Sequence, residues 1–208
     1  MEVNYIDHMG SDLSVVNAAR VSFDKRHETF DPVADAGLIK FLAREGHKSP
    51  FNHTFLTLHI RAPIFVARQL VKHKFMPWNE MSGRYVRFKP EFFLPKFFRK
   101  KALDKKQGSG DPISDSNTLL LLFKENHHDC FKRYERALEE GLCEEQARSL
   151  LPTDLMTQWY WSGTVGAWSD MYRLRAQPDA QVETQDIAAQ AGEIIAPLYP
   201  ESWKALTQ

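Results

Sequence analysis

The segment from Thr54 to Arg61 restricts the fold more than any other part of the sequence. Thr54, Leu56, Leu58 and Ile60 alternate there with Phe55, Thr57, His59 and Arg61. Side chains of a strand point to opposite faces in turn, so this alternation predicts a half-buried β-strand. Pro63 ends the strand and suits the first turn of a helix, which we expect over residues 64–72. A unit of strand, helix and loop therefore organises this part of the chain.

Hydrophobic spacing and end signals predict the other elements. Leu38, Phe41 and Leu42 give a helix over 34–44 an apolar stripe, and Gly46 ends it. Gly141 ends a long amphipathic helix, and Gly163 and Gly166 frame a turn. The remaining predictions are a strand at 3–7, a helix capped by Ser11 or Asp12, the long helix at about 120–138, a short helix at 144–150, a strand at 157–162, a helix carrying Trp168, Tyr172 and Arg175, and a last helix through 187–198.

The composition indicates an ordinary globular chain. With 208 residues it can bury one substantial core, so we expect a single domain over 1–208, with a flexible loop at about 100–117. Lysine plus arginine and aspartate plus glutamate both number 27, so no overall field attracts nucleic acid or a membrane. The sequence lacks a signal peptide pattern, and its longest apolar run, Leu119–Phe123, is too short to span a bilayer. We expect a cytoplasmic protein, in the host cytoplasm if the source is viral.

The stretch from Arg68 to Tyr85 has the composition of a binding site. Cations crowd there around an amide, a carboxylate and a hydroxyl: Arg68, Lys72, His73, Lys74 and Arg84 surround Asn79, Glu80 and Ser82. Pro77 interrupts helical structure, and residues 79–83 are typical of a turn. This mixture predicts a site for a polyanionic ligand with a hydrogen-bonding head.

Two other functions are compatible with the residues alone. Residues 84–106 hold nine basic and two acidic residues with interleaved phenylalanines, as in a module that binds single-stranded nucleic acid. Several histidines suggest a metal-dependent hydrolase, but His53 and His59 would lie about 20 Å apart on a strand and cannot share one ion. Cys130 and Cys143 are not closely spaced, so we expect two small buried residues and neither a disulfide framework nor a zinc site.

Several separated motifs resemble those of the flavin-dependent thymidylate synthases. The family signature is Arg-His-Arg, seven residues, then Ser, and this chain has Lys72-His73-Lys74, seven residues, then Ser82. The resemblance extends to 17–23, 46–51, 62–69, 79–85, 147–152 and 174–181. It covers most of the chain outside residues 95–117, in the same order as in the family.

The resemblance implies reductive methylation of dUMP to dTMP, with methylenetetrahydrofolate as carbon donor and FAD, reduced by NADPH, as hydride carrier. Arg175 matches the arginine that activates the pyrimidine, so that no cysteine nucleophile is needed. Arg84, Arg148 and Gln69 would bind phosphate and sugar, because guanidinium and amide groups suit those oxygens. The full set implied for dUMP is Arg68, Gln69, Leu70, Val71, Lys72, Glu80, Met81, Ser82, Gly83, Arg84, Arg148 and Arg175.

The same resemblance implies a set of FAD-binding residues. They are His47, Ser49, Lys72, His73, Lys74, Glu80, Thr164, Val165, Gly166 and Asp170. Several depart from the family pattern: lysine replaces arginine at 72 and 74, and Thr164, Gly166 and Asp170 stand where Asn, Arg and Asn are usual. Lysine lacks the planar fork of arginine. No metal is implied.

The family fold is α+β, a single mixed domain with a central antiparallel sheet flanked by long helices. The resemblance also implies a homotetramer whose active sites are shared between subunits. The expected partners are dUMP, folate, NADPH and further copies of the chain, without nucleic acid or membrane.

Overall fold

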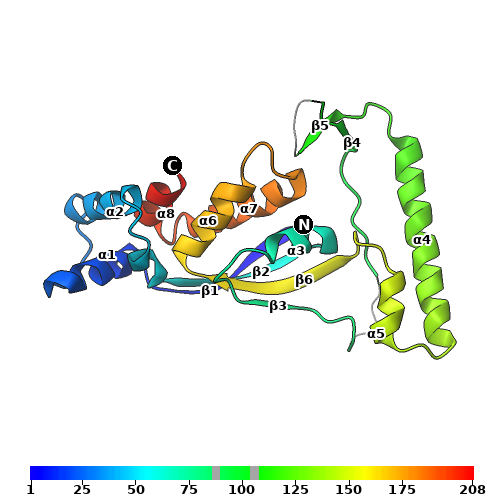
Figure 1. Cartoon of the computed structure of the whole chain (residues 1–208), viewed down its shortest axis with the longest axis horizontal. Helices are drawn as coiled ribbons and strands as arrows, with labels where there is room; N and C mark the ends of the chain where they lie inside the picture. Colours follow the sequence, from blue (N-terminus) through cyan, green and yellow to red (C-terminus); the bar gives the residue numbers. More distant parts are fainter. Residues whose placement is uncertain (86–89, 104–107) are drawn as a thin grey trace.

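The computed structural model describes residues 1–85, 90–103 and 108–208, and its centre is a four-stranded antiparallel sheet (Figure 1). The strand order is β1-β2-β6-β3, so the two central strands, β2 and β6, pair with each other. Their bounds are β1 Glu2–Met9, β2 Phe55–Pro63, β3 Trp78–Glu80 and β6 Met156–Gly163. The alternation in the sequence thus gives the strand that was predicted, and the fold is α+β with an antiparallel sheet, as expected.

One face of the sheet carries the core. Leu58 lies opposite Trp161 and Ile60 opposite Trp159, and all four side chains are buried. The helices α3 (Ile64–Leu70), α6 (Val165–Arg175) and α7 (Val182–Ile195) contact the strands of the sheet. On the opposite face, residues such as His59 and Tyr160 remain half-buried or exposed. Functional side chains on the helix-covered face are therefore held against a rigid aromatic layer.

The helices α1 (Asp12–Arg20), α2 (Ala34–Arg44) and α8 (Pro200–Thr207) gather beyond one end of the sheet, with the short turns η1 (Val21–Phe23) and η2 (Ser49–Asn52) (Figure 1). Buried Asp12 ties α1 to α8, because its carboxylate accepts hydrogen bonds from the backbone N of Glu201 at 2.8 Å and of Ser202 at 2.9 Å. A carboxylate at a helix N-terminus satisfies free N–H groups and favours the helix dipole.

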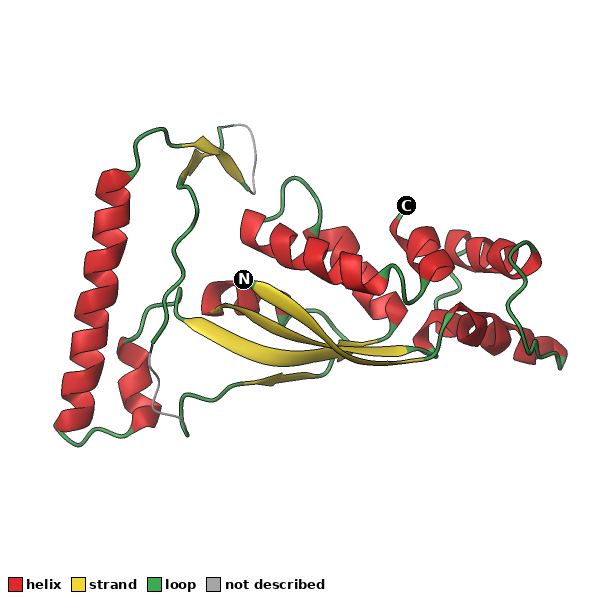
Figure 2. Cartoon of the chain, turned by 180° about the vertical axis from the view of Figure 1, so that it is seen from behind, coloured by secondary structure: helices red, strands yellow, loops and turns green. Residues whose placement is uncertain are grey.

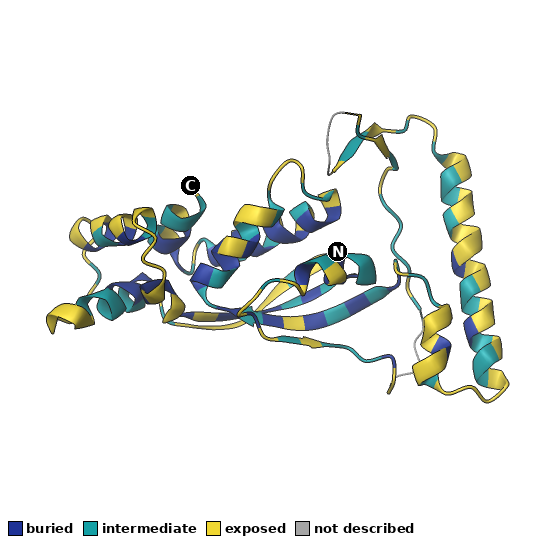
Figure 3. Cartoon of the chain, in the orientation of Figure 1, coloured by how far each residue is buried: buried dark blue, intermediate teal, exposed yellow. Residues whose placement is uncertain are grey.

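The long helix α4 (Asn117–Glu139) stands apart at the other end of the sheet (Figure 2). It is followed by α5 (Glu144–Ala147) and η3 (Arg148–Leu150), and preceded by a small hairpin of β4 (Arg99–Lys101) and β5 (Ser109–Pro112). His127 of α4 reaches Asp154, with Nε2 2.6 Å from Oδ2. Most of α4 is exposed or half-buried along its length (Figure 3).

The predicted helix over 34–44 is confirmed with both of its ends. The strands at 3–7 and 157–162 lie within β1 and β6, and Gly46 and Gly141 follow their helices with φ of +71° and +88°. None of the helices in the described ranges has the length and apolar character required to cross a bilayer.

Several local predictions were wrong, and each error has a physical cause. Asn79 and Glu80 belong to β3 instead of a turn, because pairing with β6 outweighs their weak strand preference. Phe41 is exposed and packs on His47, while Ala36, Ile39 and Leu42 face the core. The helix from Ile64 ends at Leu70, two residues early, and Gly166 lies inside α6.

Parts of the loop expected at 100–117 pair as the β4–β5 hairpin, residues 104–107 lie outside the described residues, and the flexibility of the loop stays a prediction. Two further predictions need correction. Cys143 is exposed and Cys130 half-buried, so neither is the buried residue expected. The last predicted helix, through 187–198, corresponds to α7, which ends at Ile195, and the following helix α8, which begins at Pro200, was not predicted.

Candidate active site

Arg175, at the C-terminus of α6, is held by two neutral groups. Its Nε donates to Nε2 of His73 at 3.0 Å, and its Nη2 donates to the backbone oxygen of Gln69 at 3.0 Å. Because guanidinium is only a donor, His73 must accept through Nε2 and carry its proton on Nδ1. Burial, with the charge of Arg175, lowers the pKa of His73 to about 4, and burial lowers the pKa of Arg175. The pair therefore carries one positive charge at neutral pH.

Aromatic rings connect this pair to β3. The His73 ring lies 6.1 Å from the Trp161 ring, which is 5.5 Å from Trp78, and Trp78 stacks on Trp159 with centroids 4.4 Å apart. Large buried rings have few rotamers available in a packed core. The side chains beside them are consequently fixed in position.

Glu80 lies on the same face of the sheet, opposite Trp159 in the strand register. Its carboxylate accepts hydrogen bonds from Nε1 of Trp78 at 3.2 Å and from Oγ1 of Thr157 at 2.9 Å. Two donors on one carboxylate fix its orientation while lone pairs remain for a ligand. An aromatic face with one arginine at one side and one glutamate at the other can orient a planar ring that bears both donors and acceptors.

A cavity of about 540 Å³ adjoins His73 at the N-terminus of α6. Its lining residues are Lys48, Asn52, His73, Lys74, Phe75, Thr164, Gly166, Ala167 and Asp170. Thr164 is the N-cap of α6, and its hydroxyl accepts from the backbone N of Ala167 at 3.1 Å. Helix N-termini and lysine side chains both attract anions. The cavity therefore suits a phosphate-bearing ligand.

Two features limit what enters this cavity. Lys48 is paired with Asp170, with Nζ 2.8 Å from both carboxylate oxygens, so part of the positive charge is already balanced. Gly166 leaves space that a side chain would fill, since a Cβ there would lie 3.0 Å from Oδ1 of Asn52. The lysines, the helix N-terminus and this glycine fit the pyrophosphate of a dinucleotide such as FAD.

The residues proposed for a nucleotide are only partly brought together. Gln69 lies next to Arg175, and Glu80 faces the aromatic layer. Leu70 is a buried core residue and Gly83 is buried, Met81 and Ser82 are half-buried, and Arg68, Val71, Lys72, Arg84 and Arg148 are exposed. Arg84 lies over the Tyr85 ring at 4.9 Å, and Arg148 bonds only to the Glu145 carbonyl at 3.2 Å among the described partners.

No hydrogen bond or ion pair within the described ranges joins Ser82, Arg84 or Arg148 to Gln69 or Arg175. The short helix α5, next to which Arg148 lies, is well separated from α6 (Figure 1). One copy of the chain thus presents these residues as separate groups.

The residues proposed for a flavin divide in a similar way. His73, Lys74, Thr164, Gly166 and Asp170 line the cavity of 540 Å³, whereas His47, Ser49, Lys72, Glu80 and Val165 do not. Sequence reasoning missed Lys48, Asn52, Phe75 and Ala167, which also line it. Lys48 and Asn52 lie in or next to the matched segment 46–51, so their position in the sequence was a usable signal.

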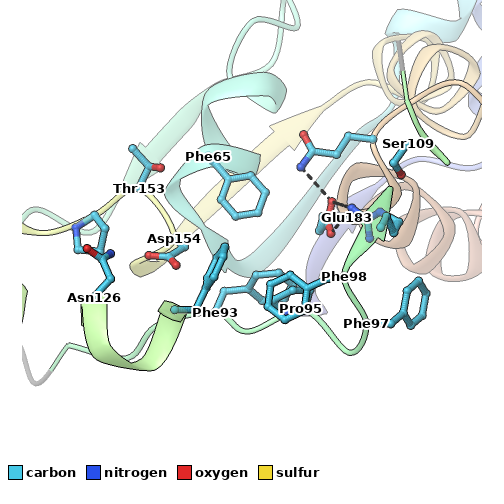
Figure 4. Close-up of a pocket in the computed structure, with 14 residues that line it drawn as sticks. Phe65, Phe93, Pro95, Phe97, Phe98, Ser109, Asn126, Thr153, Asp154 and Glu183 are labelled. Carbon is cyan, nitrogen blue, oxygen red and sulfur yellow. Dashed lines mark hydrogen bonds and ion pairs between the residues drawn. The ribbon is translucent and has the colours of Figure 1, made fainter. Parts of the chain in front are cut away.

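A second cavity, of about 510 Å³, lies between α3, α4 and the segment before β4. Phenylalanine rings line it between Glu183 at one end and Asp154 and Asn126 at the other (Figure 4). Phe92 stacks on His127, Phe93 packs on Phe65 and Phe98 on Phe123, so these rings contact the protein itself. These contacts explain the three phenylalanines as ordinary packing residues, which weakens the nucleic-acid interpretation of 84–106. Residues 86–89 and 104–106 of that segment lie outside the described residues.

Among residues 1–85, 90–103 and 108–208, no group of three or more His, Cys, Asp or Glu side chains is arranged to hold a metal ion. His59 instead lies within hydrogen-bond distance of Gln158, with Nε2 3.0 Å from Oε1.

Comparison with known proteins gives concordant results. A family profile described as thymidylate synthase complementing protein matches residues 4–201. The flavin-dependent thymidylate synthase of Thermus thermophilus is 38% identical over 206 residues, which cover 99% of this chain and 75% of that protein. The enzyme of the same description from Kosmotoga olearia is 37% identical over 207 residues, covering 98% and 88%.

A solved structure has a closely similar fold. The UMP/dUMP methylase PolB from Streptomyces cacaoi, bound with 5-Br dUMP, superposes with a TM-score of 0.91 at 31% identity, covering 99% of this chain and 94% of that one.

Proposed function

The chain belongs to the flavin-dependent thymidylate synthase family, and from that premise we propose how its residues convert dUMP to dTMP. Methylenetetrahydrofolate is the carbon donor, and FAD, reduced by NADPH, supplies the hydride when bound. Arg175 stabilises the negative charge that develops on the pyrimidine as its ring becomes nucleophilic. The chain acts as one domain over residues 1–208.

The observation that carries this proposal is the neutral surroundings of Arg175. Both of its hydrogen-bond partners, His73 and the Gln69 carbonyl, are uncharged, so its positive charge is not cancelled locally. Its Nη1 makes no hydrogen bond within the described residues and is not among the buried atoms that lack a partner, so it is open to a ligand. A fixed cation that needs no rearrangement is what electrostatic stabilisation of a transition state requires.

The cavity at α6 supports the placement of FAD. Its lysines and helix N-terminus would hold the pyrophosphate, and neutral His73, which lines the cavity and bonds Arg175, would hold the ring end next to the pyrimidine. Thr164, Gly166 and Asp170 contribute as lining residues, as does Lys74. His47, Ser49, Lys72, Glu80 and Val165 stay in the proposed set as residues that would contact FAD outside this cavity.

We assign phosphate binding to Arg84, Arg148, Arg68, Lys72 and Ser82, and ring and sugar binding to Gln69 and Glu80. Because one copy leaves these groups apart, a complete site needs a second copy, consistent with a homotetramer with shared sites.

The test compares Arg175→Ala with Arg173→Ala, an exposed arginine on the same helix. Each purified holoenzyme is given dUMP, methylenetetrahydrofolate and NADPH, and dTMP is quantified by chromatography. We expect Arg175→Ala to lower dTMP formation by roughly 10²- to 10³-fold while the bound flavin spectrum persists, and Arg173→Ala to behave as the wild type. Full methylation by Arg175→Ala would show that another group activates the pyrimidine. A wild-type protein that binds no flavin would refute the assignment as a whole.

A further inference from the structure

Four polar side chains form a continuous hydrogen-bonded relay from α3 to β4. Gln69 Nε2 donates to Oε1 of Gln181, and Gln181 Nε2 donates to Oε2 of Glu183 at 2.9 Å. Glu183 in turn accepts from Nη2 of Arg99, with distances of 2.7 Å and 2.9 Å to its two oxygens. The relay begins beside Arg175, because the backbone oxygen of Gln69 is one of that arginine's two partners.

The charged end of the relay fixes the direction of every bond in it. An ionised carboxylate only accepts hydrogen bonds, so the amide of Gln181 must turn its NH₂ group toward Glu183. Gln181 therefore directs its amide oxygen toward Gln69, and Gln69 must donate a hydrogen bond to it from its own NH₂ group. The amide of Gln69, which would otherwise be free to flip, has one orientation.

The relay is anchored where solvent cannot easily replace its bonds. The side chain of Glu183 is 6% exposed and that of Arg99 is 17% exposed. Glu183 lies in the wall of the phenylalanine-lined cavity, with dashed lines marking its bonds (Figure 4). Leaving either charge of a buried ion pair unpaired is strongly unfavourable, so the carboxylate keeps its position and its acceptor role.

The orientation leaves one atom of Gln69 available. Its Oε1 accepts no hydrogen bond from the described residues, and it is not among the buried polar atoms that lack a partner. We propose that Gln181 and Glu183 are positioning residues, which hold the Gln69 amide so that its Oε1 accepts a hydrogen bond from the bound nucleotide. This inference rests on the proposed function, in which Gln69 contacts dUMP.

The chemistry of dUMP narrows what that oxygen can recognise. A fully ionised phosphate has only acceptors, so Gln69 Oε1 cannot bind it. The donors of dUMP are the N3–H of the uracil and the 3′-hydroxyl of the sugar. Either group could donate a hydrogen bond to Gln69 Oε1. A nucleotide that lacks this donor would leave Gln69 Oε1 unpaired, which weakens binding.

The experiment measures selectivity by calorimetric titration of the holoenzyme. The ligands are dUMP, its 3′-deoxy analogue and dCMP, whose N3 has a lone pair in place of the proton. The variants are Gln181→Met, Gln69→Met and, as a control, Gln185→Met, a glutamine on α7 whose amide donates only to the Ala180 carbonyl at 2.7 Å.

We expect the wild type and Gln185→Met to prefer dUMP over one of the two analogues by roughly tenfold or more. In Gln181→Met and Gln69→Met that preference should fall to about twofold or less, while affinity for the disfavoured analogue stays within about twofold of wild type. Loss of preference against the 3′-deoxy analogue would identify the hydroxyl as the donor, and loss against dCMP would identify N3–H.

Two results would overturn the relay. One is unchanged selectivity in Gln181→Met when Gln69→Met has lost it, and the other is a uniform loss of affinity for all three ligands in Gln181→Met. A wild-type holoenzyme that binds no dUMP would overturn the proposed function itself, and the relay with it.

Discussion

Acid should destabilise the protein through His73, because protonation would place a second cation 3.0 Å from Arg175. Burial and Arg175 lower the pKa of His73 from 6.5 to about 4. Between these two pKa values His73 is protonated in the unfolded chain but not in the folded chain, so the free energy of unfolding rises with pH in this window. Stability contributed by the neutral ring is present above pH 6.5 and is lost as the pH falls toward 4.

The change in the free energy of unfolding follows from the pKa shift of His73. Each pKa unit corresponds to about 1.4 kcal/mol, so the unscreened limit over the whole window is about 3 kcal/mol. His73 is only partly buried, and solvent screening reduces this to about 1 to 2 kcal/mol.

The pH dependence of the free energy of unfolding can be measured by urea unfolding at fixed protein concentration and pH 7.5, 6.5, 5.5 and 4.5. The proteins compared are the wild type and His73→Gln, whose amide oxygen can still accept a hydrogen bond from Arg175. His128→Gln, an exposed histidine of α4, is the control. Carboxylates titrate in every variant, so the difference between curves isolates His73. Parallel curves for the wild type and His73→Gln across the window would refute a neutral, acceptor His73.

Two further substitutions test the proposed flavin cavity and the packing of α1 on α2. Gly166→Ala puts a Cβ 3.0 Å from Oδ1 of Asn52 and should weaken flavin binding several-fold in a fluorescence titration. The control is Gly37→Ala, at a helical glycine with nothing within 4 Å, which should leave flavin binding unchanged and stabilise the chain by about 0.5 to 1 kcal/mol. Equal flavin affinity in the two variants would contradict the cavity assignment. Asp35→Asn removes the charge of a fully buried carboxylate that binds Arg20 at 2.6 Å and His27 at 3.1 Å, so urea unfolding should show a loss of about 3 kcal/mol. The exposed Asp129→Asn should cost under about 0.5 kcal/mol, and a similarly small loss for Asp35→Asn would refute its structural role.

Local rules predicted the elements that leave a local pattern in the sequence. The alternation at 54–60 and the glycines after α2 and α4 are such patterns, and their predictions were confirmed, although β2 itself is stabilised by pairing with β1 and β6. The strand β3 was not predicted by these rules, because it forms only through pairing with β6, about 80 residues later in the chain. Phe41 was misassigned because hydrophobicity alone does not reveal which of two overlapping helical stripes meets the core.

The sequence named candidate site residues, whose roles stay proposals, but it did not show how they are arranged. The motif resemblance named His73, Gln69 and Arg175, yet the bond from Arg175 to His73 joins residues 102 apart in sequence. The Lys48–Asp170 pair spans 122 residues, and no spacing rule predicts it. The relay through Gln181 and Glu183 likewise depends on how α7 meets α3 and β4.

The charges of the partly buried arginines separate structural roles from the proposed catalytic role. Four described arginines are half-buried, and three of them bind carboxylates: Arg20 binds Asp35, Arg61 binds Glu91 and Arg99 binds Glu183. The fourth, Arg175, has no carboxylate within ion-pair distance among the described residues. Desolvating a cation without a counter-ion costs stability, and the other three described half-buried arginines avoid that cost. A carboxylate near Arg175 would relieve it, but would also cancel the field that a developing anion needs. The unpaired charge is therefore best explained by a ligand whose own negative charge completes the site.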